Sequence, residues 1–144
     1  MSKAASFEMT LHVRDHCLCL AAQRAARSLA RRFDEALRPA GLTSGQFSLL
    51  TSLNRPDPPS IGEVAAVLGM DRTTLTANLK PLERRGLLET IVDPADRRGR
   101  LVKLTEAGLA VLETATPIWV RVHAEVEAAL EEPAGARTAL RALA

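Results

Sequence analysis

One segment of this 144-residue chain holds eight of its 19 basic side chains. Eight lysines and arginines fall between positions 72 and 103, namely Arg72, Lys80, Arg84, Arg85, Arg97, Arg98, Arg100 and Lys103. The stretch that follows, up to position 132, is acidic, with Arg121 set against six glutamates. One basic and one acidic segment indicate a basic face that binds a polyanion, although a solvated surface would show the same charges.

The octapeptide DPADRRGR, residues 93–100, places arginines and aspartates side by side between two apolar runs. A guanidinium on a protruding loop suits the narrow minor groove of DNA, where the negative potential attracts arginine. Asp93 and Asp96 would repel phosphates, so we expect one or both to pair with Arg97 and shape the loop, which leaves Arg98 free to reach DNA. A turn that is merely soluble is the alternative.

A second set of polar side chains lies in DRTTLTANLKPLERRG, residues 71–86. Helical spacing puts Leu75, Leu79 and Leu82 on one face. The opposite face carries Thr73, Thr76, Ala77, Lys80 and Arg84. Threonine and arginine can hydrogen-bond to base edges, and lysine and arginine can neutralise phosphates, so this face suits a DNA groove. An exposed face in a helical bundle would have the same pattern.

The elements that position these side chains form a predicted helix-turn-helix followed by a hairpin. The segment SIGEVAAVLGM begins with Ser60 and Glu63 at the spacing of a capping box and stops at Gly69. Asp71 is the expected N-cap of the next helix, and Gly86 suits its C-terminal end. The runs LLETIV (87–92) and RLVKL (100–104) then predict a β-hairpin, which directly after a helix-turn-helix is a wing.

Long helices are expected on both sides of this lobe. Apolar residues recur at helical spacing over residues 11–39, up to Pro39 and Gly41. Thr43 and Gln46 form a second capping-box pattern. Thr105 should cap a helix that runs to about position 131 with a bend at Pro117, and residues 136–144 should form a short final helix. These end segments carry more apolar surface than one small domain can cover, which favours a dimer.

Composition limits the class of protein. The chain is 47% hydrophobic and 25% charged, with 3% aromatic residues, which is typical of one globular and mainly helical domain. The first sixteen residues have no apolar stretch of signal-peptide length and no segment has the length of a membrane span, so we expect a cytoplasmic protein without membrane contact. Walker, G-x-S-x-G, H-E-x-x-H and dinucleotide motifs are absent from the sequence, which argues against an enzyme, and no cofactor is predicted.

The order of these elements resembles the MarR (multiple antibiotic resistance regulator) family of winged helix-turn-helix regulators over residues 11–130. The most specific matches are LLETIVDPADRRGRLVKLTEAG in the wing and GMDRTTLTANLKPLERRGL in the recognition helix. The resemblance implies a mainly α fold with a β-hairpin wing, in one domain over residues 1–144. Residues 43–104 would form the DNA-binding lobe, and residues 11–40 and 105–144 the dimerisation helices.

The resemblance also implies a homodimer that binds a pseudo-palindromic operator, usually as a repressor, with half-sites roughly 10 bp apart. Arg98 would enter the minor groove. The residues expected in or beside the major groove, or on the backbone, are Ser60, Arg72, Thr73, Thr74, Thr76, Lys80, Arg84, Arg97 and Arg100. A winged-helix module that binds another protein and not DNA is the alternative, because a fold alone does not fix a function.

The family resemblance further implies a small aromatic or anionic effector between the dimer helices and the winged lobe. The candidate lining residues are Phe33, Phe47, Ile118 and Trp119, with Arg24 or His16 as a polar partner, although the apolar ones could equally be core.

The cysteines and two of the histidines carry weaker hypotheses. Cys17 and Cys19 are two apart on the expected helix, so their side chains should diverge by about 200° and would not bridge each other. Either is a candidate oxidant sensor, as the family resemblance allows, or simply a buried cysteine. His12 and His16 have the i, i+4 spacing of a metal pair, but the sequence specifies no full ligand set, and no metal site is predicted.

Overall fold

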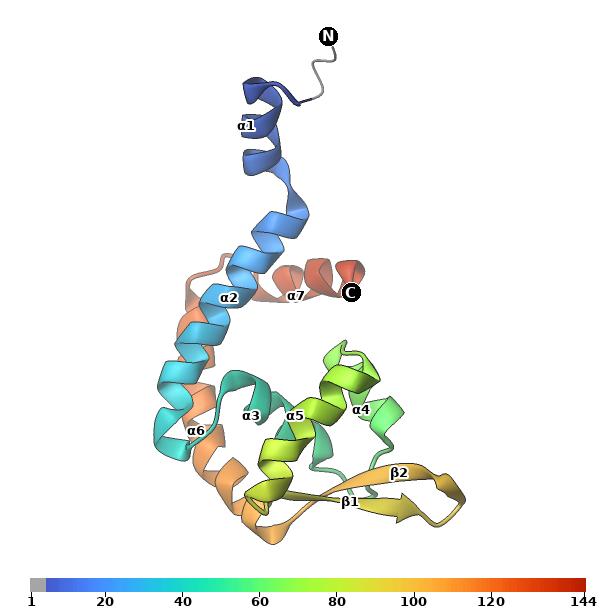
Figure 1. Ribbon diagram of the computed structural model, residues 1–144. Coiled ribbons are helices and arrows are strands. Elements are labelled where there is room, and N and C mark those ends of the chain that lie inside the picture. Colours follow the sequence, from blue (N-terminus) through green and yellow to red (C-terminus); the bar gives the residue numbers. More distant parts are fainter. Residues whose placement is uncertain (1–4) are drawn as a thin grey trace.

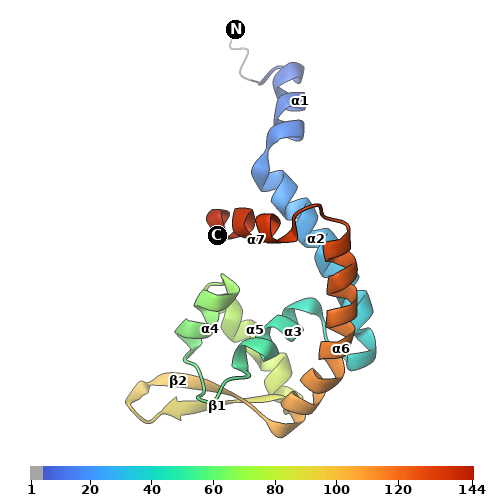
Figure 2. The same cartoon turned by 180° about the vertical axis from the view of Figure 1, so that it is seen from behind.

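The computed structural model describes residues 5–144. Its elements are α1 (Phe7–His16), α2 (Leu18–Leu37), the short 3-10 helix η2 (Arg38–Ala40), α3 (Ser44–Leu53), α4 (Ile61–Leu68), α5 (Arg72–Arg84), β1 (Leu88–Asp93), β2 (Asp96–Leu104), α6 (Glu106–Ala128) and α7 (Pro133–Leu143). Helices α3 to α5 and the hairpin form a winged lobe, and α2 and α6 lie side by side next to it (Figures 1 and 2). The predicted class, mainly α with a β-hairpin wing, is confirmed.

The core of the winged lobe consists of leucines and valines from every one of its elements. Leu75, Leu79 and Leu82 of α5 are buried, as their spacing predicted. They pack in one cluster with apolar residues of α2, α3, α4, the hairpin and α6. Because α5 is held by this buried stripe, the opposite side of the helix must face outward.

The prediction of one continuous helix over residues 11–39 is wrong. The chain forms α1 from Phe7 and breaks at Cys17, whose φ of −70° and ψ of 111° are extended. The Cys17 amide donates to the Val13 carbonyl, and its Sγ accepts from the Leu20 amide at 3.4 Å, so this one residue ends α1 and caps α2. The apolar spacing continues across the break, and therefore periodicity could not reveal it.

Several helix ends follow the capping patterns of the sequence. The capping box of Thr43 and Gln46 forms in full, and Asp71 and Thr105 cap α5 and α6. The box expected from Ser60 and Glu63 forms only by half.

The Ser60 hydroxyl accepts from the Glu63 amide, but the Glu63 carboxylate pairs with Arg55 at 3.4 Å instead of turning back to Ser60. An arginine within reach competes successfully for the carboxylate, and spacing along one helix does not show that competitor. The final helix also begins earlier than predicted, at Pro133.

The hairpin is longer than the sequence indicated. Its strands cover Leu88–Asp93 and Asp96–Leu104, so most of DPADRRGR belongs to the strands and only residues 94 and 95 form the turn. The register runs from Leu88↔Leu104 to Val92↔Arg100 and then shifts to Asp93↔Asp96, which leaves residues 97–99 as a bulge. The predicted loop is therefore a bulged strand end, and bulges redirect side chains.

The end helices expose large apolar side chains. On α1, Phe7, Met9 and Val13 are exposed, and α7 exposes Leu140 and Leu143. Figure 1 shows α1 extending away from the rest of the chain. None of the helices in residues 5–144 combines the length and hydropathy required to cross a membrane.

Candidate nucleic-acid interface

The outer face of α5 is a row of exposed polar side chains. Thr73, Thr76, Lys80 and Arg84 are all exposed, opposite the buried leucines of the same helix. The structure therefore brings together the side chains that the sequence grouped on this face. A helix whose inner side is fixed by core packing presents such a row in a defined orientation, as groove recognition requires.

The N-terminus of α5 is fixed by its aspartate cap. The Asp71 carboxylate accepts from the amide and the hydroxyl of Thr74, at 2.8 Å each. These hydrogen bonds hold the pKa of Asp71 below its ordinary value, since they favour the charged form. The cap is therefore complete at neutral pH and is lost only as the pH falls through that lowered pKa.

The threonines of α5 differ in what they can offer a ligand. Thr74 donates its hydroxyl proton to Asp71, and Thr76 donates to the Arg72 carbonyl at 2.8 Å. Both hydroxyl oxygens remain available as acceptors. The Thr73 hydroxyl makes no hydrogen bond to any part of residues 5–144 and can act as donor or acceptor. Sequence spacing placed all three alike and could not separate them.

At the wing tip, the pairing predicted for Asp93 and Asp96 is wrong. Within the described chain neither aspartate forms an ion pair with Arg97. Asp93 accepts from the Ala95 amide at 2.9 Å, and Asp96 accepts from the Arg98 amide at 3.0 Å. Both carboxylates thus shape the turn through backbone amides, a habit of aspartate in turns, and both Arg97 and Arg98 are exposed.

Arg100 has a structural contact that the sequence did not indicate. Its guanidinium donates to the carbonyls of Arg97 and Gly99, at 3.2 and 3.1 Å, and so holds the bulge. Gly99 suits the same place, because a Cβ there would make a tight contact, 3.3 Å from both the Asp93 Cβ and the Asp96 carbonyl oxygen. These contacts stabilise the bulge, and the side chains of Arg97 and Arg98 are exposed at the tip.

The two arginines at the end of α5 have separate surroundings. Arg85 donates to the Gly41 carbonyl at 2.9 Å and ties α5 to the end of η2. Arg84 stays exposed in the last turn of the helix. Ser60, another predicted contact, is the half-buried N-cap of α4, and its hydroxyl already accepts from the Glu63 amide.

A separate cavity of about 260 Å³ lies between α2, α3 and α6. Its lining consists of Phe33, Leu37, Ser44, Phe47, Ser48, Trp119 and His123. The Trp119 ring stacks on the His123 ring at 4.4 Å between centroids and on Phe47 at 6.2 Å. Three of the predicted effector residues, Phe33, Phe47 and Trp119, therefore meet at one cavity.

The other predicted effector residues lie elsewhere. Ile118 packs against the core beside this cavity without lining it. Arg24 lines an open hollow of about 570 Å³ on α2 with Arg27 and Arg31, and His16 lies on α1. The polar partner that the sequence missed is His123, whose Nδ1 lies 3.5 Å from the Glu127 carboxylate. Its position one turn after Trp119 was a signal that could have found it.

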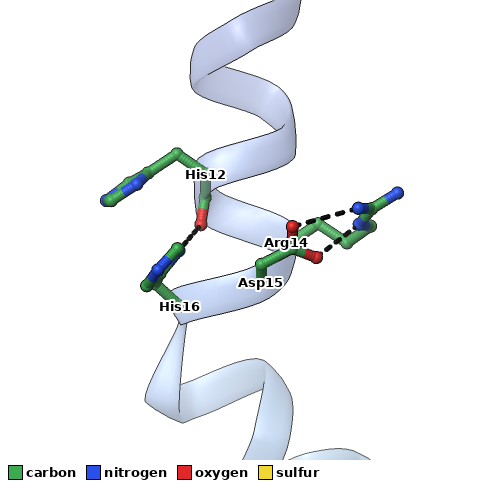
Figure 3. Close-up of polar contacts among 4 residues, drawn as sticks. All are labelled: His12, Arg14, Asp15 and His16. Carbon is green, nitrogen blue, oxygen red and sulfur yellow. Dashed lines mark hydrogen bonds and ion pairs between the residues drawn. The ribbon is translucent and has the colours of Figure 1, made fainter.

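The histidine pair at the N-terminal end is shown in Figure 3. His12 and His16 stack at 4.2 Å, and His16 Nδ1 lies 2.9 Å from the His12 carbonyl oxygen. The Asp15 carboxylate accepts two hydrogen bonds from the Arg14 guanidinium, and these bonds raise the pKa of Arg14. Residues 5–144 contain no group of three or more metal-ligating side chains placed to hold an ion.

The two cysteines do not share one continuous helix, because the chain breaks between α1 and α2. Cys17 is extended and half-buried, whereas Cys19 is helical and exposed. The expected divergence of about 200° therefore does not describe this pair.

Comparisons with known proteins agree with this geometry. Residues 40–99 match the family model described as MarR family. The activatory protein BadR of Rhodopseudomonas palustris is 33% identical over 101 residues, which are 68% of this chain and 58% of BadR. The chain thus spans about half the length of the curated relatives it matches.

Solved structures match over nearly the whole chain. The M. tuberculosis transcriptional regulator MosR in complex with DNA has a TM-score of 0.83 and 39% identity, over 89% of this chain and 93% of that one. The apo form of E. coli MarR has a TM-score of 0.68 and 30% identity, over 88% and 93%. The prediction that the chain is not an enzyme agrees with these regulators.

Proposed function

Because this chain belongs to the MarR family of transcriptional regulators, we propose that it binds double-stranded DNA in a sequence-specific manner and regulates transcription. One observation carries the proposal. The exposed row on α5 and the two exposed arginines of the wing tip belong to one lobe, in which α5 and the base of the hairpin share one hydrophobic core, so the helix and the wing would approach DNA together. The MosR structure, which matches over 89% of this chain, is a complex with DNA.

The proposed active form is a homodimer. Support comes from the apolar side chains that the protomer leaves exposed on α1 and α7, the first and last helices of the described chain. Burial of such surface between two copies is the usual way to remove it from water. Two-fold symmetry then requires two half-sites about one helical turn, or roughly 10 bp, apart on the operator.

Selection from a random duplex library tests the proposal and identifies the operator in the same experiment. The wild-type protein should enrich an inverted repeat with half-sites roughly 10 bp apart. Enrichment of a single unrepeated half-site would contradict the dimer. Failure to enrich any sequence would instead favour the protein-interaction module. We propose that the chain acts as a repressor. Because the relative BadR is named as an activatory protein, the direction of regulation needs its own test, which is a reporter gene driven by the enriched site.

The cavity between α2, α3 and α6 is the proposed effector site. Its aromatic walls, with the Ser44 and Ser48 hydroxyls and the His123 ring, suit a small aromatic acid. Trp119 is the only tryptophan, so its fluorescence reports on this cavity alone. We expect benzoate, taken as a probe, to quench that fluorescence in a saturable manner.

The replacement Ser48→Leu should fill the cavity and weaken benzoate binding by roughly tenfold or more. Thr51→Leu, on the same helix but outside the lining, is the matched control. Equal quenching in both variants would place the benzoate somewhere other than this cavity.

Oxidant release is the second proposed mode of regulation, and it rests on Cys17. Its Sγ accepts from the Leu20 amide at the start of α2, and the free, half-buried thiol lies at the break between α1 and α2, so its oxidation would disturb the start of α2. Peroxide should then reduce DNA binding of the wild type more than that of Cys17→Ser. Equal loss in the two proteins would rule out Cys17 as the sensor.

A further inference from the structure

The guanidinium of Arg72, the first residue of α5, folds back onto α4. A Cβ built on Gly62 would lie 2.8 Å from Arg72 Nη2, 3.5 Å from its Cζ and 3.8 Å from its Nε. The guanidinium of Arg72 therefore rests on the first turn of the preceding helix. This contact exists only because position 62 has no side chain.

The charge of Arg72 is not neutralised by the acids around it. Glu63, the next residue of α4, pairs with Arg55. Asp71, which precedes Arg72, is occupied by the amide and hydroxyl of Thr74. Within residues 5–144 the Arg72 guanidinium forms no ion pair, and the residue is exposed. A positive group held in this way is ready to meet an anion from outside.

We infer that Arg72 contacts a DNA backbone phosphate and reads no base, and that Gly62 is the residue that positions it there. The inference rests on the proposed DNA-binding function. In a helix-turn-helix the recognition helix enters the major groove, while the first helix crosses the sugar-phosphate backbone. Because the Arg72 guanidinium lies against α4, it would be close to the DNA phosphates that this helix crosses. Such contacts set affinity and register but carry no sequence information.

Gly62→Ala tests the positioning role with little risk to the fold. The new methyl group meets only the far end of a flexible side chain, so Arg72 moves and the helix does not. Gly45→Ala is a closely matched control, because Gly45 is also the second residue of its helix and has nothing within 4 Å of its Cβ position. Both variants should keep the wild-type melting temperature or raise it, since alanine favours helix over glycine.

The assay compares the library-selected duplex with a shuffled duplex at several salt concentrations. Arg72→Ala should weaken binding to both duplexes by the same factor, roughly tenfold, and lower the salt slope by about one. Gly62→Ala should also weaken binding to both duplexes by one factor, whereas Gly45→Ala should leave binding to either duplex unchanged. In the Arg72→Ala background, Gly62→Ala should have no further effect, because its target is gone.

Three results would overturn the inference. A smaller preference for the selected duplex in Arg72→Ala would make Arg72 a base reader. Unchanged affinity in Gly62→Ala, or an effect of Gly62→Ala that persists without Arg72, would remove the positioning role. These results leave the proposed function standing, whereas a wild-type protein that prefers no duplex and shows no salt dependence overturns both.

Discussion

Gly108→Ala is expected to destabilise the fold by about 3 kcal/mol, the upper part of the range for overpacking. A Cβ at position 108 would lie 2.0 Å from the Leu87 carbonyl oxygen and 2.7 Å from Leu104 Cδ1. The Leu87 backbone cannot withdraw easily, because its carbonyl accepts from the Thr105 amide and its amide donates to the Leu82 carbonyl. The start of α6 is thus pressed against the base of the wing.

Urea unfolding at one fixed protomer concentration measures this effect, since the stability of a dimer depends on concentration. Gly45→Ala is the control, because its Cβ position is open. A Gly108→Ala midpoint equal to that of Gly45→Ala would mean that the α6–wing junction is looser than the structure has it. The same close approach explains why a glycine ends the LTEAG pattern.

Arg98→Ala is expected to weaken binding to the selected duplex by roughly 1–3 kcal/mol while the dimer stays intact. The Arg98 backbone is fixed by its amide hydrogen bond to Asp96, and its side chain is exposed at the bulged tip. Because the tip is already ordered, little entropy is lost when the arginine enters a minor groove.

Fluorescence anisotropy gives the affinity, and sedimentation velocity gives the oligomeric state. Arg14→Ala removes the same charge from α1, outside the lobe, and should change the affinity little. If Arg98→Ala bound as tightly as Arg14→Ala, the wing would have no part in recognition.

Local chemistry predicted the winged lobe well. Caps such as Thr43, Asp71 and Thr105 act within three residues of themselves, so their patterns in the sequence suffice to locate helix starts. The buried stripe of α5 follows from the helical period alone, and with it the exposed row that faces outward.

Contacts that join distant segments or compete with a local pattern were missed. Arg55 takes the Glu63 carboxylate from its expected cap, and Cys17 interrupts an apolar period that continues on both sides of it. At the wing tip, Asp93 and Asp96 accept hydrogen bonds from backbone amides two residues further along the chain, because these amides are closer partners than the mobile guanidinium of Arg97. The lining of the cavity that we propose for an effector was predicted only in part, because His123 of α6 was missed.

The most direct test of the central claim is an anisotropy titration of the wild-type protein with the selected duplex and a shuffled duplex, at about 50 and about 200 mM salt. A specific DNA-binding regulator predicts a strong preference for the selected duplex and a steep loss of affinity with salt, as phosphate contacts release counterions. Equal affinity for both duplexes, or binding that salt leaves unchanged, would contradict specific DNA recognition and indicate a winged helix that serves another partner.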